Sequence, residues 1–586
     1  MTNIDILTML VGISGGLAFF LFGMNVMSSG LEKMAGGKLE SSLKKVTSKY
    51  FLSMILGAGI TIAIQSSSAM TVMLVGLVNS GIMQFGQTFG LIMGSNVGTT
   101  LTSWILSLAG LEGDGNIFLM LLRPVIFAPF LALFGTILRM FSKKERHHDI
   151  GAILIGFTIL IIGMDMMSGA VGIIEEKGGL EVLLTMFSNP IMALLVSVLF
   201  TGIIQSSAAT VGIVQTLALT GTITYGMAIP LVLGANIGTC VTALIACIGT
   251  EKNAKRVSAI HTYVNVIGAI IFMIGLGVVS IVAPNLSSTH TTMFGVALIH
   301  TIFNVTISIV LTPFRKWIIR LAEITVPTKK DEIAKTVFLD ERLLATPSVA
   351  ISECKRLVVE MAELTRSSYR DAVALLDNYS EEKALAIRET EGVIDRYEDK
   401  LGTYLVKLSG SDLSGEDSHE VGRLLHSIGD FERISDHAVN LVDAAEEIHS
   451  KKISFSDKAK TELGVIAAAV NEILDLTVDS FNTDNAVLAS EVEPLEEVID
   501  NLKDTLRKRH VSRLQEGKCT IELGFVFSDL LTNYERISDH CSNIAVSTIQ
   551  VRTDKQDAHK YLRGIKSGEN EQYIGEFDSY SKKYTV

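Results

Sequence analysis

The 586-residue chain is poor in cysteine and proline, and its first half is poor in charge. Its five cysteines include no Cys-x-x-Cys pair, so neither a disulfide scaffold nor a zinc site is expected. Residues 1–326 hold 17 Lys/Arg and 13 Asp/Glu, a net charge of +4, whereas the remainder holds 33 and 49, a net charge of −16. This contrast predicts a membrane half followed by an acidic soluble half.

Long apolar runs fill the first half. A membrane-spanning helix needs roughly 20 mostly apolar residues. The first residues lack the basic start of a secretory signal and are expected to begin the first span. We therefore expect a multi-pass protein of the inner (cytoplasmic) membrane. The predicted spans are residues 7–28, 86–110, 117–140, 151–172, 226–249, 257–282 and 291–312.

Two further apolar runs are interrupted by a Gln-Ser-Ser sequence, and each piece alone is too short to cross a bilayer. Such segments are typical of re-entrant hairpins or broken helices, which are tolerated only where the backbone is buried in protein or lines a cavity. The interrupting residues are Gln65, Ser66, Ser67 and Ser68 in the first run and Gln205, Ser206 and Ser207 in the second.

The two interrupted runs belong to an internal duplication. Residues 20–30 match 160–170, and residues 94–104 match 234–244, with the same offset of 140 that separates Gln65 from Gln205. Three blocks at one spacing indicate a repeat. If each hairpin returns to its own side, a repeat crosses the membrane an odd number of times, so the second copy is predicted to be inverted.

Loop charges agree with this orientation. With the acidic half in the cytoplasm, the inner loops at 30–50, 139–149, 251–256 and 313–330 contain 17 Lys/Arg, whereas the outer loops at 111–116, 173–190 and 283–290 contain only Lys177. This is the positive-inside distribution.

Paired broken helices are typical of secondary transporters. N–H groups at a half-helix start and Ser hydroxyls can donate to an anion, while amide and hydroxyl oxygens suit a hard cation such as sodium. Packing between helices is the alternative for the Asn and Thr residues. The candidate sodium ligands are Gln65, Ser68, Asn96, Thr99, Gln205, Ser207, Asn236 and Thr239.

The stretches "QSSSA" and "QSSAA", with the downstream "GSNVGTT" and "GANIGTC", resemble the type II sodium/phosphate cotransporter family over about residues 8–320. The resemblance implies that the two QSS segments meet head to head and bind phosphate and sodium. Ala208 stands where the family has a third Ser, which leaves the sodium number and the substrate affinity open. The implied phosphate ligands are Gln65, Ser66, Ser67, Ser68, Gln205, Ser206 and Ser207.

Other polar residues in the apolar half have alternative interpretations. Arg123 either attracts anions or reaches the outer interface, and Asp165 either pairs with a cation or makes a structural hydrogen bond. Two His/Asn pairs at i,i+4 lie within 261–265 and 300–304, and for these we favour hydrogen bonds between packed helices.

The residue pattern of the second half predicts helices. An amphipathic interfacial helix is predicted at 312–324, and long helical patterns follow. Residues 431–441 match 534–544 and residues 391–401 match 496–506, which indicates two related three-helix bundles. The fold class is therefore all-α, with two inverted membrane repeats and a soluble helical domain. The predicted parts are 1–150, 151–312, 313–340, 341–555 and a mobile tail at 556–586.

Each soluble repeat carries paired carboxylates at i,i+4. Surface charge solvated by water is the simple interpretation, but facing helices with such pairs can also hold transition metals. The motif "ERISDHA" resembles the PhoU family of cytoplasmic phosphate-signalling proteins, whose E/D-x-x-x-D helices can bind iron or manganese. The candidate metal ligands are Glu391, Asp395, Glu432, Asp436, Glu496, Asp500, Glu535 and Asp539.

Together these features predict a sodium-dependent symporter of inorganic phosphate, regulated by a PhoU-like cytoplasmic domain. The alternatives are a phosphate exporter that acts as an overflow valve and a membrane-anchored phosphate sensor without a transport cycle. An enzyme is not expected, because the sequence has no nucleophile motif or nucleotide-binding loop. Nucleic acid is not an expected partner, and a homodimer is compatible with the sequence.

Overall fold

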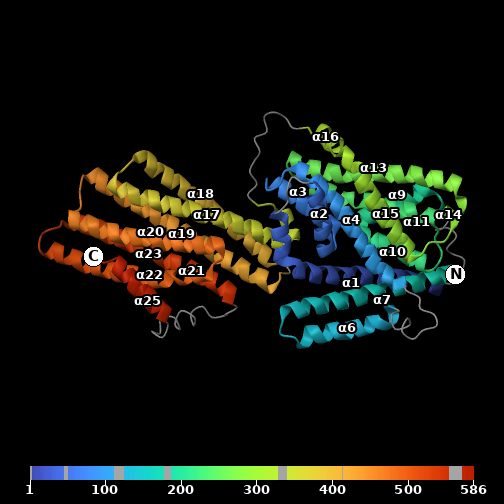
Figure 1. The fold of residues 1–586 in the computed structure, drawn as a ribbon, viewed down its shortest axis with the longest axis horizontal. Helices are drawn as coiled ribbons and strands as arrows, with labels where there is room; N and C mark the ends of the chain where they lie inside the picture. Colours follow the sequence, from blue (N-terminus) through green and yellow to red (C-terminus); the bar gives the residue numbers. More distant parts are fainter. Residues whose placement is uncertain are drawn as a thin grey trace. The chain divides into compact units, whose positions relative to one another are not determined.

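The computed structural model describes residues 3–44, 50–110, 124–176, 187–327, 339–411, 413–553 and 571–586 (Figure 1). Regular structure in these ranges is helical, which confirms the all-α prediction. The chain divides into two compact units, Met1–Val349 (unit 1) and Ala350–Val586 (unit 2).

Unit 1 contains the apolar helices. The elements that position the site are α1 (Asn3–Lys44), α2 (Tyr50–Ile64), α3 (Ser67–Asn79), α4 (Thr88–Ser107), α7 (Glu145–Glu176), α9 (Pro190–Ile204), α10 (Ser207–Leu219) and α11 (Tyr225–Gly238). The others are α6 (Pro124–Phe141), α12 (Cys240–Ala246), α13 (Lys252–Val282), α14 (Pro284–Ser288), α15 (Met293–Leu311), α16 (Arg315–Thr325) and the short 3₁₀ helices η1 (Phe85–Gln87), η2 (Leu108–Gly110), η3 (Thr312–Phe314) and η4 (Glu341–Ala345).

Five helical segments in the described residues are long and apolar enough to cross a bilayer. They overlap five of the seven predicted spans. The predicted span at 86–110 contains α4, whose hydroxyl residues and glycines lower its hydropathy, and the span at 117–140 lies partly outside the described residues. The five segments are Leu7–Met34, Glu145–Ile173, Tyr225–Ala246, Lys252–Val282 and Met293–Thr325.

The chain breaks at both QSS sequences, as predicted. Helices α2 and α9 have bounds that differ by 140, and so do α3 and α10. The backbone of Gln65 has φ 51° and that of Gln205 has φ 60°, both in the left-handed region that ordinary residues avoid. The duplication therefore extends to the local conformation of the break. The inverted orientation of the two copies in a bilayer stays a prediction.

Glycines allow α1 and α7 to pack backbone against backbone. A β-carbon on Gly23 would lie 2.4 Å from the backbone nitrogen of Leu160, and one on Gly163 would lie 2.4 Å from that of Phe20. Gly23 and Gly163 are also equivalent positions of the two repeats. Because small residues let helices approach closely inside a membrane, this contact fixes α1, which lines the candidate site described below.

In its described residues, unit 2 contains two three-helix repeats and a C-terminal helix. The first repeat is α17 (Pro347–Asp377), α18 (Glu381–Ser409) and α19 (Gly415–Lys451). The second is α20 (Asp457–Thr483), α22 (Val492–Gln515) and α23 (Ile521–Thr553), with the short α21 (Ala486–Ser490) before α22. Within the predicted mobile tail at 556–586, residues 556–570 lie outside the described residues, and α25 (Glu571–Lys583) packs against α22 and pairs Lys583 with Glu472.

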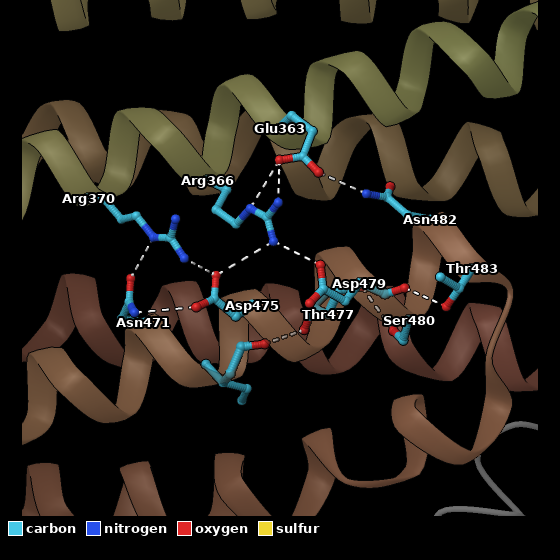
Figure 2. A network of polar contacts seen from close by, with 11 residues as sticks. Glu363, Arg366, Arg370, Asn471, Asp475, Thr477, Asp479, Ser480, Asn482 and Thr483 are labelled. Atoms are coloured by element: carbon cyan, nitrogen blue, oxygen red, sulfur yellow. Dashed lines mark hydrogen bonds and ion pairs between the residues drawn. The ribbon is translucent and has the colours of Figure 1, made fainter.

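A polar network joins the first helices of the two repeats (Figure 2). Arg366 of α17 binds Glu363 on its own helix and Asp479 of α20, the latter at 2.9 Å. Arg370 reaches Asp475 at 2.6 Å, and Asn482 donates to Glu363 at 2.9 Å. Partly exposed pairs contribute little one by one, so the network mainly fixes the register of α17 on α20.

Substitution of Gly163 by Ala should destabilise unit 1, because its methyl group would overlap the backbone of α1. Overpacking of this kind typically costs about 1–3 kcal/mol. Thermal unfolding of the purified protein in detergent measures the effect. Gly169→Ala on the same helix is the control, since nothing lies within 4 Å of a β-carbon there. Equal midpoints for the two variants would contradict the packing.

Candidate functional site

The two QSS segments line one cavity in unit 1. Its volume is about 290 Å³, near the lower limit of roughly 300–1,000 Å³ typical of small-ligand sites. The seven residues predicted from the QSS motifs all lie in its lining. Among the described residues, the lining consists of Met24, Asn25, Ser28, Glu32, Ile64, Gln65, Ser66, Ser67, Ser68, Ala69, Thr99, Gln205, Ser206, Ser207 and Ala208.

Helices α3 and α10 both begin at this cavity. Ser66 is the N-cap of α3 and accepts a hydrogen bond from the backbone nitrogen of Ala69 at 3.1 Å. Ser206 caps α10 in the same way, with Ala209 at 3.2 Å. Each cap satisfies one of the N–H groups of the first helical turn, and the first-turn residues Ser67, Ser68, Ala69, Ser207 and Ala208 line the cavity. Two positive helix ends therefore adjoin the same space.

The two glutamines differ in their surroundings. Gln65 is buried, donates from Nε2 to the carbonyl of Ile62 at 2.7 Å, and accepts from the hydroxyl of Thr102 at 2.8 Å. Gln205 is exposed, although its backbone has the same left-handed conformation. Ser68 donates to the carbonyl of Gln205 at 3.4 Å, which connects the two hairpins directly. The site therefore has one fixed amide and one accessible amide.

Helix α1 adds four lining residues that the sequence analysis missed. Asn25, Ser28 and Glu32 recur at i, i+3 and i+7, so they lie on one face of the helix. Ser28 donates to the carbonyl of Ile64 at 2.7 Å, directly before the break, and so connects α1 to the first hairpin. The polar face within an apolar helix was the available signal, but only the α1–α2 contact places it at the cavity.

The candidate sodium ligands outside the QSS motifs divide into two groups. Thr99 lines the cavity. Asn96, Asn236 and Thr239 are not in its lining as described, and their side chains hydrogen-bond within or between helices: Asn96 donates to Asn265, Asn236 to the Val232 carbonyl and Thr239 to the Ala235 carbonyl. Their assignment to sodium stays a prediction.

The other polar membrane residues have packing contacts. His300 hydrogen-bonds Ser103 at 2.7 Å, Asn304 donates to the carbonyl of His300, and Asn265 donates to that of His261. The His300–Ser103 contact joins α15 to α4, as the packing interpretation expects, whereas Asn304 and Asn265 donate within their own helices. Asp165 is exposed, and Arg123 lies outside the described residues.

Unit 2 brings the predicted carboxylate pairs close together on neighbouring helices. Burial and the nearby charges of Asp436 and Asp395 raise the pKa of Glu391. Burial and Asp436 raise the pKa of Glu432 to about 6. In the first repeat, acidic groups from α18 and α19 therefore repel one another, and Arg433 compensates them in part, at 3.5 Å from Glu432 and 3.4 Å from Asp436.

The second repeat has a cationic side chain beside its carboxylate pairs. Lys503 binds Glu535 at 2.8 Å and lies 3.8 Å from Asp500, and its hydrogen bond to Glu535 raises the pKa of the ammonium group. The equivalent residue in the first repeat is Glu398. Among the described residues, no group of three or more His, Cys, Asp or Glu side chains is placed to hold a metal ion. The assignment of these carboxylates to a metal stays a prediction.

Comparison with known proteins agrees with both halves of this description. A family model described as Na+/Pi-cotransporter matches residues 19–169 and 174–306, and the PhoU domain model matches 358–445 and 464–548. The chain is 22% identical over 557 residues to the proposed inorganic phosphate export protein YjbB of Salmonella typhimurium, covering 94% of this chain and 99% of that one.

Two further relatives each match one half. The Thermotoga maritima phosphate-specific transport system accessory protein PhoU homolog 1 is 25% identical over 213 residues, covering 36% of this chain and 90% of its own length. Sodium-dependent phosphate transport protein 2A of Rattus norvegicus is 34% identical over 97 residues, covering 16% of this chain and 15% of its own. The chain thus belongs to the Na+/Pi-cotransporter family of phosphate transporters and carries a C-terminal PhoU domain.

Proposed function

We propose that unit 1 is a sodium-coupled transporter of inorganic phosphate whose substrate binds between the two QSS segments. The observation that carries the proposal is the meeting of two capped half-helix starts in one hydroxyl-lined cavity. An anion that leaves water needs fixed donors, and the first-turn N–H groups and Ser hydroxyls supply them without a full counter-charge.

The electrostatics of the cavity favour a cation as co-substrate. Its lining as described contains no Lys or Arg, and its one ionisable side chain is the carboxylate of Glu32. Phosphate therefore enters without a basic residue in contact. Sodium prefers oxygen ligands, and the cavity offers them from amides, hydroxyls and Glu32. The same lining can hold both ions. Sodium would then reduce the repulsion between phosphate and Glu32, and phosphate would reduce the repulsion between sodium and the positive helix ends.

The membrane potential determines how the direction of phosphate transport depends on the number of coupled sodium ions. Moving one negative charge into a cell at −100 mV costs about 2.3 kcal/mol, so uptake requires enough sodium ions to compensate. The same voltage assists export. We favour sodium-driven uptake, with export as the second candidate because the relative YjbB is named for it. A sensor without a transport cycle is the remaining alternative.

The soluble unit is proposed to regulate transport from the cytoplasmic side of the inner membrane and to have no catalytic role. Its PhoU domain and the positive charge of the predicted inner loops support this placement.

Phosphate flux in proteoliposomes of known orientation tests the function. Sodium-driven uptake predicts radiolabelled phosphate entry that rises with an inward sodium gradient and stops when choline replaces sodium. Sodium-independent efflux driven by voltage would favour the exporter. Phosphate binding without flux in either direction would favour the sensor and contradict transport.

Substitution of Gln65 or Gln205 by Ala should abolish phosphate flux while the protein stays folded. Each change removes an amide from the cavity and leaves the helices in place. Ser14→Ala is the control, because Ser14 is exposed on α1 and donates only to carbonyls of its own helix. Near-normal flux by both glutamine variants would exclude the assigned site.

Thr102→Val should weaken phosphate transport through Gln65. It removes the hydroxyl that holds Oε1 and leaves that oxygen buried without its donor, a change worth about 1–3 kcal/mol, or roughly 5- to 150-fold in affinity. Its counterpart Thr242→Val is the control, because the Thr242 hydroxyl has no partner among the described residues. Equal phosphate affinities for the two variants would remove Thr102 from the site.

A further inference from the structure

The segment before the soluble unit is docked against the far end of α3. Asp340 caps η4, accepting the backbone N–H of Arg342 at 2.9 Å, and α17 begins only one residue after η4 ends. Asp340, Leu343 and Thr346 are each at most 2% exposed. This level of burial is that of a packed core and differs from a flexible linker. Residues 340–346 are called the docking segment below.

Asn79, the last residue of α3, is held at both ends of its amide. Its Nδ2 donates to Asp340 Oδ2 at 2.6 Å, and its Oδ1 accepts the backbone N–H of Glu251 at 2.8 Å. The amide is buried, so both bonds compensate for lost water. The C-terminal end of α3 is therefore attached to the docking segment and to the start of α13.

Arg342 extends the attachment to α12. Its guanidinium pairs with both oxygens of Asp340 at 3.0 Å. It also donates to the carbonyls of Ala246 at 2.5 Å and Ile248 at 2.8 Å, which lie at the end of that helix. Carbonyls there lack partners within the helix and carry its negative dipole end, so a cation is well placed.

Leu343 completes the contact through Gly76. A β-carbon on Gly76 would lie 3.0 Å from Leu343 Cδ2, so the leucine occupies the space that any larger residue on α3 would fill. The second repeat lacks both determinants, because Thr216 replaces Gly76 and Leu219 replaces Asn79. Docking at α3 is thus a specific feature of the first hairpin.

We propose that the docking segment positions α3 and couples the first phosphate-binding hairpin to α17. The coupling rests on the proposed function, since Ser66, Ser67 and Ser68 stand at the other end of the same helix. That helix has 13 residues, so movement at its start displaces Asn79 about 18 Å away. Because coupling between two sites is reciprocal, the state of the soluble unit changes phosphate affinity by the same factor.

Hydrogen exchange of the full-length protein in nanodiscs, with and without inorganic phosphate, tests the coupling. In the wild type, saturating phosphate in sodium buffer should slow amide exchange in residues 340–355 by about fivefold or more, within the usual range of coupling energies. Asn79→Leu, which installs the residue of the second repeat, should still bind phosphate by calorimetry, about fivefold more weakly because the coupling is reciprocal, and should lose this response. Arg342→Gln is a second variant that should likewise bind phosphate and lose the exchange response.

The control is Ser80→Thr, again the residue of the second repeat, which keeps its hydroxyl and leaves the docking contacts intact. It should retain the response. A wild type that binds phosphate without any change at 340–355, or variants that keep the full response, would overturn the coupling alone. A wild type that binds no phosphate would overturn the proposed function and the coupling together.

Discussion

The membrane unit depends on the cost of removing an ion from water. Any path across a low-dielectric layer must replace hydration by fixed dipoles, and within a helix the backbone N–H groups lack helical partners only in the first turn. The chain meets this demand by breaking two helices at Gln65 and Gln205, at the cost of a left-handed backbone in each glutamine. The Ser66 and Ser206 caps each satisfy one first-turn N–H group directly after the break.

The two breaks have the same backbone conformation but differ in the surroundings of their glutamine side chains. Gln65 is buried and held by Thr102, whereas Gln205 is exposed. Helix α1 contributes Ser28 and Glu32 to the cavity, and the equivalent positions in α7 hold Ser168 and Gly172. Docking at Asn79 adds a third difference. A duplicated fold has therefore acquired one fixed and one more accessible half, which suits a site that must hold its substrate and also release it.

The soluble unit shows the same divergence between repeats. Its carboxylate pairs recur at equivalent positions, but Lys503 compensates the second cluster and Glu398 adds charge to the first. Acidic groups that raise one another's pKa values repel one another. A bound cation or a shift in helix packing would reduce this repulsion. The attachment of α17 to the docking segment gives such a shift a path toward α3.

The sequence alone determined the helical class, the two units and the position of both breaks, because an apolar run too short to cross and interrupted by Gln-Ser-Ser has few stable conformations in lipid. It also located every QSS residue of the cavity. Only the tertiary structure decided that α1 lines the cavity, that Asn96 bonds Asn265, and that Asp340 is buried against Asn79. Those outcomes depend on contacts between residues 36 to 261 positions apart, and the spacing of residues along one helix carries no information about which neighbour it will meet.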